Sequence, residues 1–484
     1  MVGPGAIHDK GESTVRKSFR LAAGVVALGL VAAACSEDNG TSSGTTAGEA
    51  ATTAAPATTT ATSAATGSSE APTTTGSSNA DRDKVALDYV GATEAKAASG
   101  DPITIGYVNQ EGATPAFPEN TVGLEAAVDY INSTLGGVQG RPVQIKKCVV
   151  QKEEDGQKCG QEMLADDSVK FILTGTLVLG NQPLYDTVAG QKPIFVGNPV
   201  TTPDFLAKDA FAFTPGSPGV IQGMAIYAAT GLPAGKPTKA AVVYSDNAAG
   251  QAAYNLLTKP VLEKYGIQVT GVPIPDTAGP QDFAPAIQAA GAQDAQVFIP
   301  LVTIQGCIGT YDALKQLGIT TPVVTTGLCF GTPMTEHLAQ AGEKGEQPDG
   351  WYFGGYGYSY FIPGNPELDT YISVIQDYAK AKGIKDIEYT GFAGPTFGNA
   401  LTLVKFMNAI GPDNVTPDTL RAAANGFAGP MWGVVGPMAC GKNPIFPSLC
   451  GIQMGIQQYK DQKWVSIADG YNGKPIDPTN PPAG

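Results

Sequence analysis

Apolar runs of strand length alternate with amphipathic segments of helix length over most of the chain. Residues 103–108 ("ITIGYV") and 169–175 ("VKFILTG") are such runs, and the apolar positions of 120–137 between them follow helical spacing. Two further runs, 142–150 and 193–199, continue the pattern. Apolar runs separated by helices are typical of βαβ units, so this part of the chain predicts a parallel sheet.

The same rhythm restarts further along the chain. It predicts helices at 250–266 and 304–318 and strands at 239–245, 267–274, 295–302 and 322–328. The second helix ends at Gly318, which suits a C-cap. We therefore expect an α/β fold of two doubly wound, Rossmann-like lobes. Such sheets bind ligands beyond the carboxyl ends of their strands, so the cleft between the lobes is the expected site.

The N-terminus has the pattern of an export signal. A basic cluster at 16–20 precedes a run of small and apolar residues, 21–34, which is too short for a membrane span of about 20 residues. Residues 32–35 ("AAAC") resemble a bacterial lipobox, in which the cysteine becomes the lipidated first residue. We expect a lipoprotein signal peptide at 1–34 and a lipid on Cys35. The alternative is an ordinary cleaved signal with an incidental cysteine.

A Thr-, Ala- and Ser-rich tract follows Cys35 and lacks the large apolar residues that would bury a core. We expect residues 35–100 to form a disordered tether, whose last part, 81–100, is a short helical or irregular lead-in. The protein would then sit at the outer face of the cell membrane and touch it only through the lipid anchor.

The remaining cysteines are even in number, which in an exported chain predicts disulfides. Six cysteines allow 15 connectivities, and closeness in sequence favours three pairs: Cys148 with Cys159, Cys307 with Cys329, and Cys440 with Cys450. A metal site is the alternative. No CxxC motif occurs and His337 is the one histidine beyond the anchor, so we expect neither metal nor cofactor.

Charge and motifs narrow the function classes. The formal net charge is −14, and no stretch clusters Lys and Arg with aromatic residues, so a nucleic-acid partner is not expected. The chain has no GxSxG, phosphate-loop or HExxH motif, and His337 lies in a predicted surface helix. The abundant Asp and Glu leave glycoside chemistry open, but we expect a binding protein and not an enzyme.

The order of several segments resembles type I periplasmic solute-binding proteins of the branched-chain amino acid class. The segments begin with "ITIGYV…NTVGLEAAVDYINSTLGGVQGRPVQI" and continue with "PIFVGNPVTTPDF", "KAAVVYSDNAAG" and "GFAGPMWGVVGPMACG". The closing hairpin of the family resembles "IQQYKDQKWV", with Asp461 and Gln462 at the bend. The resemblance extends from about residue 101 to 476.

Members of that class are extracellular receptors of ATP-driven (ABC) importers, and three chain crossings join their lobes. The resemblance implies one lobe from 101–216 plus 363–427, another from 217–362 plus 428–476, and a tail at 477–484. We expect a monomer that captures a small molecule between the lobes and delivers it to an ABC permease. The alternative is a ligand-sensing or adhesive lipoprotein with the same fold and no importer.

The resemblance also suggests a carboxylate site in the first lobe. Hydroxyls and backbone N–H groups hold the ligand's carboxylate in the family, and the matching loops here are 174–177 and 199–203. Thr176, Thr201 and Thr202 are the expected donors. The alternative is that these threonines cap the helices that follow.

The second lobe departs from the family pattern. Amino-acid receptors of this class place an acid, which pairs with the ligand's ammonium, in a loop where this chain has Leu328 or Cys329. An unpaired buried ammonium costs several kcal/mol, which weighs against a plain α-amino acid. We expect a small polar solute with some apolar body, which is an amino acid, an amide or a related small acid, and Asp246 and Glu111 remain as acids that could face it.

Aromatic residues interleaved with glycine at 350–361 are further candidates. Alternate residues of a strand point inward, so Trp351 and Phe353 are expected in the core. The residues that we expect to contact the ligand are Tyr356 and Tyr358, with Phe392 and Phe397 beside the third crossing.

Overall fold

The computed structural model describes residues 79–484 except 114, 358–359, 361, 363, 386–388, 390, 468–474 and 482–484. The predicted signal peptide, Cys35 and the predicted tether up to residue 78 lie outside the described residues, as does Tyr358. Their predictions therefore stay predictions.

A five-stranded parallel sheet forms the first lobe, in the order β2-β1-β3-β4-β5. Its strands are β1 (Ile103–Gln110), β2 (Val143–Val150), β3 (Val169–Thr176), β4 (Ile194–Asn198) and the short β5 (Ala210–Phe211). The first four lie where the apolar runs predict them. The two-residue β5 was not predicted, because it is too short to produce a run.

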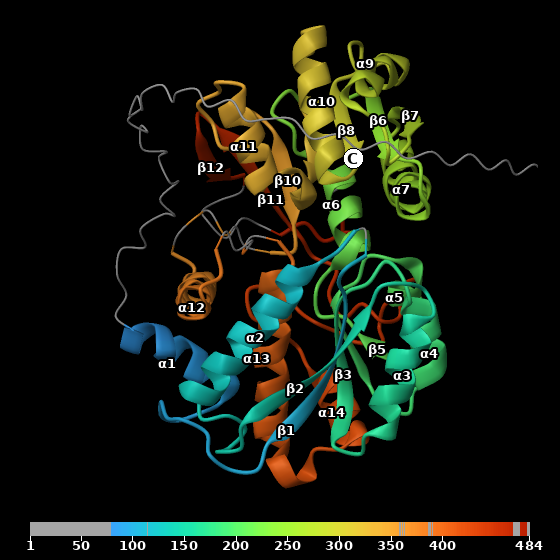
Figure 1. The fold of residues 1–484 in the computed structure, drawn as a ribbon. Coiled ribbons are helices and arrows are strands. Elements are labelled where there is room, and N and C mark those ends of the chain that lie inside the picture. The colour runs from blue at the N-terminus through green and yellow to red at the C-terminus, as the bar shows by residue number, and fades with distance from the viewer. Residues whose placement is uncertain are drawn as a thin grey trace, which may run out of the picture. The chain divides into compact units, whose positions relative to one another are not determined.

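Helices cover both faces of this sheet. Figure 1 shows α2 (Pro118–Ser133) and α13 (Ala393–Ile410) along one face, and α3 (Asp155–Ala165) and α4 (Asn181–Val188) along the other. Neighbouring strand residues alternate between the two cores: Leu173 packs with the first pair of helices and Ile172 with the second. Both faces are buried, which explains why the strands are continuous apolar runs.

Helix α1 (Asn79–Val90) docks on the first lobe against α12 (Pro366–Lys382) and α13. The Tyr89 hydroxyl bonds the Thr402 hydroxyl at 2.7 Å and accepts from the Trp432 backbone N–H at 3.0 Å. Burial raises the pKa of this phenol. The end of the predicted tether is therefore an ordered helix held by specific contacts.

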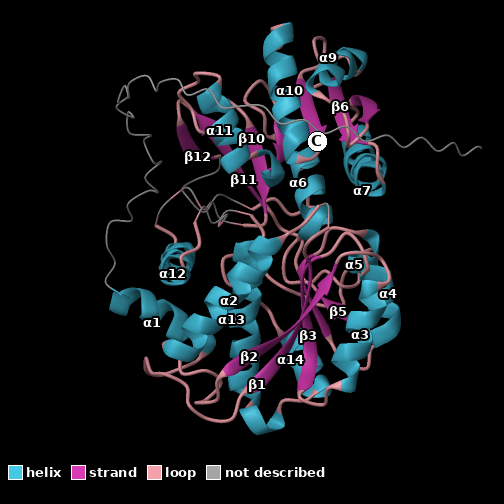
Figure 2. Cartoon of the chain, in the orientation of Figure 1, coloured by secondary structure: helices cyan, strands magenta, loops and turns pink. Residues whose placement is uncertain are grey.

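Two sheets form the second lobe, with orders β7-β6-β8 and β12-β11-β10-β9, and a bridge between Phe298 and Val323 joins them. Figure 2 shows that helices flank these strands too, and two separate cores lie on the two faces. The strands are β6 (Lys239–Ser245), β7 (Gln268–Ile274), β8 (Val297–Leu301), β9 (Val324–Thr326), β10 (Tyr352–Gly355), β11 (Gly455–Lys460) and β12 (Lys463–Ser466). Other helices among the described residues are α5 (Thr202–Leu206), α6 (Gly216–Thr230), α7 (Ala248–Ala252), α8 (Lys259–Lys264), α9 (Pro280–Ala289), α10 (Ile304–Leu317), α11 (Thr332–Gln340), α14 (Pro417–Gly426) and the 3-10 turn η3 (Pro412–Asn414).

The turns and helix ends of the second lobe agree with the sequence predictions at some positions and differ at others. Gly318 caps α10 with a positive φ of 65°, as predicted, and Asp461 and Gln462 form the predicted bend with φ of 52° and 61°. The strand predicted to reach residue 328 ends at Thr326, and a 3-10 turn, η2 (Gly327–Cys329), follows it. The single helix predicted at 250–266 contains a π-helical segment, η1 (Ala253–Thr258), between α7 and α8.

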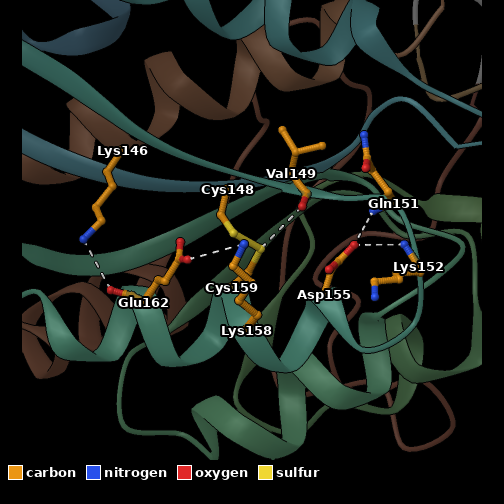
Figure 3. The surroundings of a disulfide bond; sticks show 9 residues. All are labelled: Lys146, Cys148, Val149, Gln151, Lys152, Asp155, Lys158, Cys159 and Glu162. Atoms are coloured by element: carbon orange, nitrogen blue, oxygen red, sulfur yellow. Dashed lines mark hydrogen bonds and ion pairs between the residues drawn. A yellow bond between two sulfur atoms is a disulfide. The ribbon is translucent and has the colours of Figure 1, made fainter.

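Three disulfides join Cys148 to Cys159, Cys307 to Cys329 and Cys440 to Cys450, which confirms the pairing of sequence neighbours. In Figure 3, Cys148 on β2 meets Cys159 on α3, so this bond ties an edge strand to the helix that covers it. Each such loop stabilises the fold by about 3 kcal/mol, chiefly by restricting the unfolded chain.

The segment after α14 packs with the first lobe over much of its length. Met431, Trp432 and Met438 belong to the core beneath α2 and α13, and Leu449 pairs with Ala212 beside β5. The resemblance assigned 428–476 to the second lobe, but the side chains of 428–450 contribute mainly to the first. The other lobe boundaries stay predictions.

Candidate functional site

Buried polar side chains meet at the carboxyl ends of the first-lobe strands. Asn120, near the start of α2, is their hub: its amide donates to the Phe117 carbonyl at 3.1 Å and to the Thr176 hydroxyl at 3.2 Å. Its side-chain oxygen accepts from the amide of Asn198 and the hydroxyl of Thr396, both at 2.8 Å. We call Asn120, Thr176, Asn198 and Thr396 the polar hub. It joins β3, β4, α2 and α13, so this edge is held rigid before any ligand arrives.

Thr176 is therefore a fully buried member of the hub. Its backbone N–H donates to the side-chain oxygen of Asn109 at 3.2 Å, so that donor also has a partner. These contacts give Thr176 a structural role, and direct ligand contact by it stays a prediction.

Glu111 follows β1, and both of its carboxylate oxygens have protein partners. Lys147 donates to one at 2.7 Å, while the Thr121 hydroxyl and the Asn109 amide donate to the other. Partial burial raises the pKa of Glu111, but these three donors outweigh it and the net pKa lies below the usual value. Glu111 thus fixes the loop after β1, and its contact with a ligand stays a prediction.

Replacing Glu111 by Gln is expected to lower the free energy of unfolding by about 1 kcal/mol at pH 7. A depressed carboxyl pKa contributes stability above the unfolded-state value of 4.5, and this contribution is lost as pH falls through the folded-state pKa. The difference between variant and wild type should therefore shrink below pH 4.5. Urea unfolding at pH 7 and at pH 3 measures it.

Glu154→Gln is the matched control, because Glu154 pairs with Lys152 in an exposed ion pair. It should leave stability unchanged at both pH values. An equal loss of stability by Glu111→Gln at neutral and acid pH would show that the ionised carboxylate is not the source of the effect.

Asp204 organises the loop between β4 and α5. Its buried carboxylate accepts from the backbone N–H groups of Val200 and Thr201 at 3.0 Å and from the Thr201 hydroxyl at 3.0 Å. Asn181 and Tyr185 donate to its other oxygen at 2.9 and 2.8 Å. Burial raises the pKa of Asp204, and the donors only partly offset that rise.

Thr201 occupies the N-cap position of α5, where the capping hydrogen bond is the one that Asp204 accepts from the Thr201 backbone N–H. Its hydroxyl proton goes to Asp204, and its oxygen accepts from Asn181 at 2.8 Å. Thr202, the next residue, has an exposed side chain. Of the two, Thr202 is therefore the better placed to donate to a ligand, and contact by either residue stays a prediction.

Three partly buried aromatic side chains lie beside the polar hub. The ring of Phe392 is 5.8 Å from that of Phe117, edge to face, and 6.3 Å from that of Tyr356, with 29° between the ring planes. We call them the aromatic trio. Phe117 precedes α2, Phe392 precedes α13 and Tyr356 follows β10, so the trio contains residues from both lobes.

Buried polar side chains contact the backbone carbonyls of two members of the trio, Phe117 and Phe392. The Phe117 carbonyl accepts from Asn109 at 2.8 Å as well as from Asn120, and the Phe392 carbonyl lies 3.1 Å from the Thr396 hydroxyl oxygen, whose proton goes to Asn120. Phe117 was not predicted from the sequence, because it lies in a loop without periodicity. Its one signal was its position after β1, at the ligand-binding edge of the sheet.

Other aromatic candidates are core residues. Trp351 and Phe353 are buried, as predicted. Phe397 is fully buried among residues of the first-lobe core, and its contact with a ligand stays a prediction. Its ring packs edge to face against that of Tyr371 on α12, 5.1 Å away.

Leu328 lies in η2 with a side chain that is 49 % exposed. Its neighbours are anchored: Cys329 is bonded to Cys307, and Phe330 packs edge-on against Phe353 and Trp464. The turn is therefore fixed on one side, while the side chain of Leu328 is exposed on the surface. None of the contacts described for this part of the chain joins Leu328 to the trio, so its ligand contact stays a prediction.

Asp246 follows β6 and is exposed, and it accepts from the Gln251 amide at 2.9 Å. It has no described contact with the aromatic trio either. Its role as a ligand-facing acid likewise stays a prediction.

A separate shallow hollow of about 400 Å³ lies between α2, β2 and α12. The Tyr378 hydroxyl donates to Glu125 at 2.9 Å within it, and Lys382 lies over the Tyr378 ring. Its lining includes no member of the hub or the trio. Within the described ranges, no His, Cys, Asp and Glu residues group as a metal site, and no helix is both long and apolar enough to cross a bilayer.

Comparison with known proteins identifies the family. The sequence profile described as periplasmic binding protein matches residues 102–446. The chain belongs to the periplasmic binding protein family. Proteins of this family bind solutes outside the cytoplasm and are not enzymes. A search of curated protein sequences finds no match.

Solved structures with the same fold include solute-binding proteins of ABC transporters. One from R. palustris in complex with 4-hydroxybenzoate has a TM-score of 0.58 and 16% identity, covering 78% of this chain and 96% of its own. Another from R. palustris, in complex with benzoate, has a TM-score of 0.57 and 18% identity, covering 78% and 98%. A Desulfitobacterium hafniense protein in complex with Leu has a TM-score of 0.55 and 16% identity, covering 76% and 100%.

Proposed function

We propose that this periplasmic binding protein captures a small carboxylate with an aromatic or apolar body and delivers it to an ABC importer. The observation that carries the proposal is the aromatic trio, which lies beside the strand ends where α/β sheets bind ligands. Residues from both lobes contribute to it. A ligand there would therefore favour the arrangement in which the lobes meet.

The carboxylate would bind at the first-lobe loops. The Thr202 side chain is exposed at the start of α5, and its hydroxyl would donate a hydrogen bond to the ligand's carboxylate. Thr201, through its hydrogen bond to Asp204, and Thr176, as a member of the polar hub, would hold the two first-lobe loops in place. No arginine or lysine is needed for such a site.

The missing acid supports a ligand without an ammonium group. Leu328 stands where the resembling amino-acid receptors have their acid, and an exposed leucine favours an apolar group beside it. Of the three similar structures described above, two hold benzoate-type ligands and one holds leucine. The leucine at position 328 favours the first kind for this chain.

Cys35 would carry the lipid that tethers the protein at the outer face of the membrane, close to the permease. The docked helix α1 supports this arrangement, because it gives the tether a firm attachment to the first lobe. The tether would leave the folded part at Asn79.

A thermal-shift panel on the purified protein tests the proposed ligand class. Benzoate at a thousand times its Kd should stabilise the protein by about 4 kcal/mol and raise the melting temperature by several degrees. Leucine should have little effect. A response to leucine with none to benzoate would overturn the proposed class, although not the family.

Replacing Leu328 by Glu should weaken benzoate binding about tenfold, since a charged carboxylate would lie against the apolar part of the ligand, which offers it no partner. Leucine binding should improve, because the new acid can pair with its ammonium. Leu256→Glu is the matched control: Leu256 is also exposed, at 66 %, but it lies in η1. Isothermal titration of both variants measures the effect, and equal losses in the two would remove Leu328 from the site.

A further inference from the structure

Asn198, the last residue of β4, is 99 % buried. Of the two polar atoms of its side chain, only the amide nitrogen has hydrogen-bond partners among the described residues. Its amide nitrogen donates to Asn120 at 2.8 Å, with longer contacts to the Phe392 carbonyl at 3.4 Å and the Thr396 hydroxyl at 3.5 Å. Its side-chain oxygen has no hydrogen-bond donor among the described residues. A buried acceptor without a donor is costly and rare, and it calls for a partner.

The hydrogen bonds of the polar hub determine which of the two polar atoms of the Asn198 side chain, the nitrogen or the oxygen, has no partner. The Asn120 amide donates to the Phe117 carbonyl, so its side-chain oxygen must face Asn198 and Thr396. Turning Asn198 over would place its oxygen against the oxygens of Asn120 and Phe392, which are both acceptors. The free group is therefore an acceptor, and its partner must supply an O–H or N–H.

Asn198 is close to one member of the aromatic trio, because its amide nitrogen lies 3.4 Å from the backbone carbonyl of Phe392. We propose that the side-chain oxygen of Asn198 accepts a hydrogen bond from a hydroxyl or amino group on the ligand's aromatic or apolar body. Asn198 would thus make the protein prefer ligands that carry such a hydroxyl or amino group. This inference rests on the proposed function and narrows it to carboxylates that carry a second, hydrogen-bond-donating group.

Wild-type protein and a set of related probes test the inference without any variant. Benzoate, 3-hydroxybenzoate, 4-hydroxybenzoate and the methyl ethers of the two hydroxy acids are titrated separately. One hydroxy acid should bind about tenfold more tightly than benzoate, as expected for one hydrogen bond to a buried acceptor. Its methyl ether, which cannot donate, should lose that gain.

Asn198→Leu removes the acceptor at similar volume, and the preferred hydroxy acid should then bind within twofold of benzoate. Asn399→Leu is the matched control, since Asn399 is another buried asparagine whose side-chain oxygen has no hydrogen-bond donor among the described residues, and it belongs to neither the polar hub nor the aromatic trio. It should keep the tenfold preference. Melting temperatures of both variants report on the fold, and the methyl ether result stands even if Asn198→Leu does not fold.

The outcomes separate the two proposals. If benzoate binds but no hydroxy acid is preferred, a water molecule satisfies Asn198 and this inference is wrong while the proposed ligand class stands. A preference that survives Asn198→Leu would also overturn it, because the hydroxyl would then bind elsewhere. If no benzoate derivative binds, the ligand class falls and this inference falls with it.

Discussion

Replacing Asp204 by Ala is expected to lower the free energy of unfolding by about 4 kcal/mol, because it leaves several buried donors without an acceptor. The backbone N–H groups of Val200 and Thr201 and the side chains of Asn181 and Tyr185 all converge on this carboxylate. The chain between β4 and α5 would lose the contacts that define it. Urea unfolding followed by circular dichroism measures the loss.

Asp209→Ala is the control for that variant, because Asp209 is an exposed carboxylate shortly after α5. It should change stability by less than about 0.5 kcal/mol. If Asp204→Ala costs no more than this control, the network around Asp204 does not hold the loop. The role assigned here to Thr201 as a cap would then also fail.

Replacing Phe392 by Ala should weaken benzoate binding about 30-fold, equivalent to about 2 kcal/mol. The Phe392 ring is the middle member of the aromatic trio, with Phe117 on one side and Tyr356 on the other. Its removal takes away the apolar contact that the ligand would share with both lobes. Isothermal titration calorimetry measures the change in Kd.

Phe446→Ala is the matched control for Phe392→Ala. Phe446 is also partly buried and packs edge-on against another aromatic ring, that of Phe205 at 5.8 Å. Its removal should lower stability and leave the affinity for benzoate unchanged. Equal losses of affinity in the two variants would show that general destabilisation is responsible, and unchanged affinity in Phe392→Ala would place the ligand away from the trio.

The sheets could be predicted well from the sequence. In a parallel sheet with both faces covered, each strand is an apolar run bounded by polar turns, and the limits predicted for β6 are those observed. The disulfide pairing could also be predicted, because each cysteine has one close sequence neighbour.

The site could be predicted only in part. The threonine loops and Phe392 were recognisable through the family resemblance. The polar hub was not, because Asn120, Asn198 and Thr396 are far apart in sequence and each alone is typical of a helix start or a turn. The cap role of Thr201 depends on Asp204, and a Thr-x-x-Asp pattern fits a cap and a ligand loop equally well.

The proposed preference for a carboxylate without an ammonium group is tested most directly by a calorimetric comparison of 3-phenylpropionate with phenylalanine, which differ by one ammonium group. The aromatic trio can hold either ring, while Leu328 offers no partner for the charge. We predict that the protein binds 3-phenylpropionate at least tenfold more tightly than phenylalanine. Tighter binding of phenylalanine would contradict the account and show that another acid of the chain pairs with the ammonium.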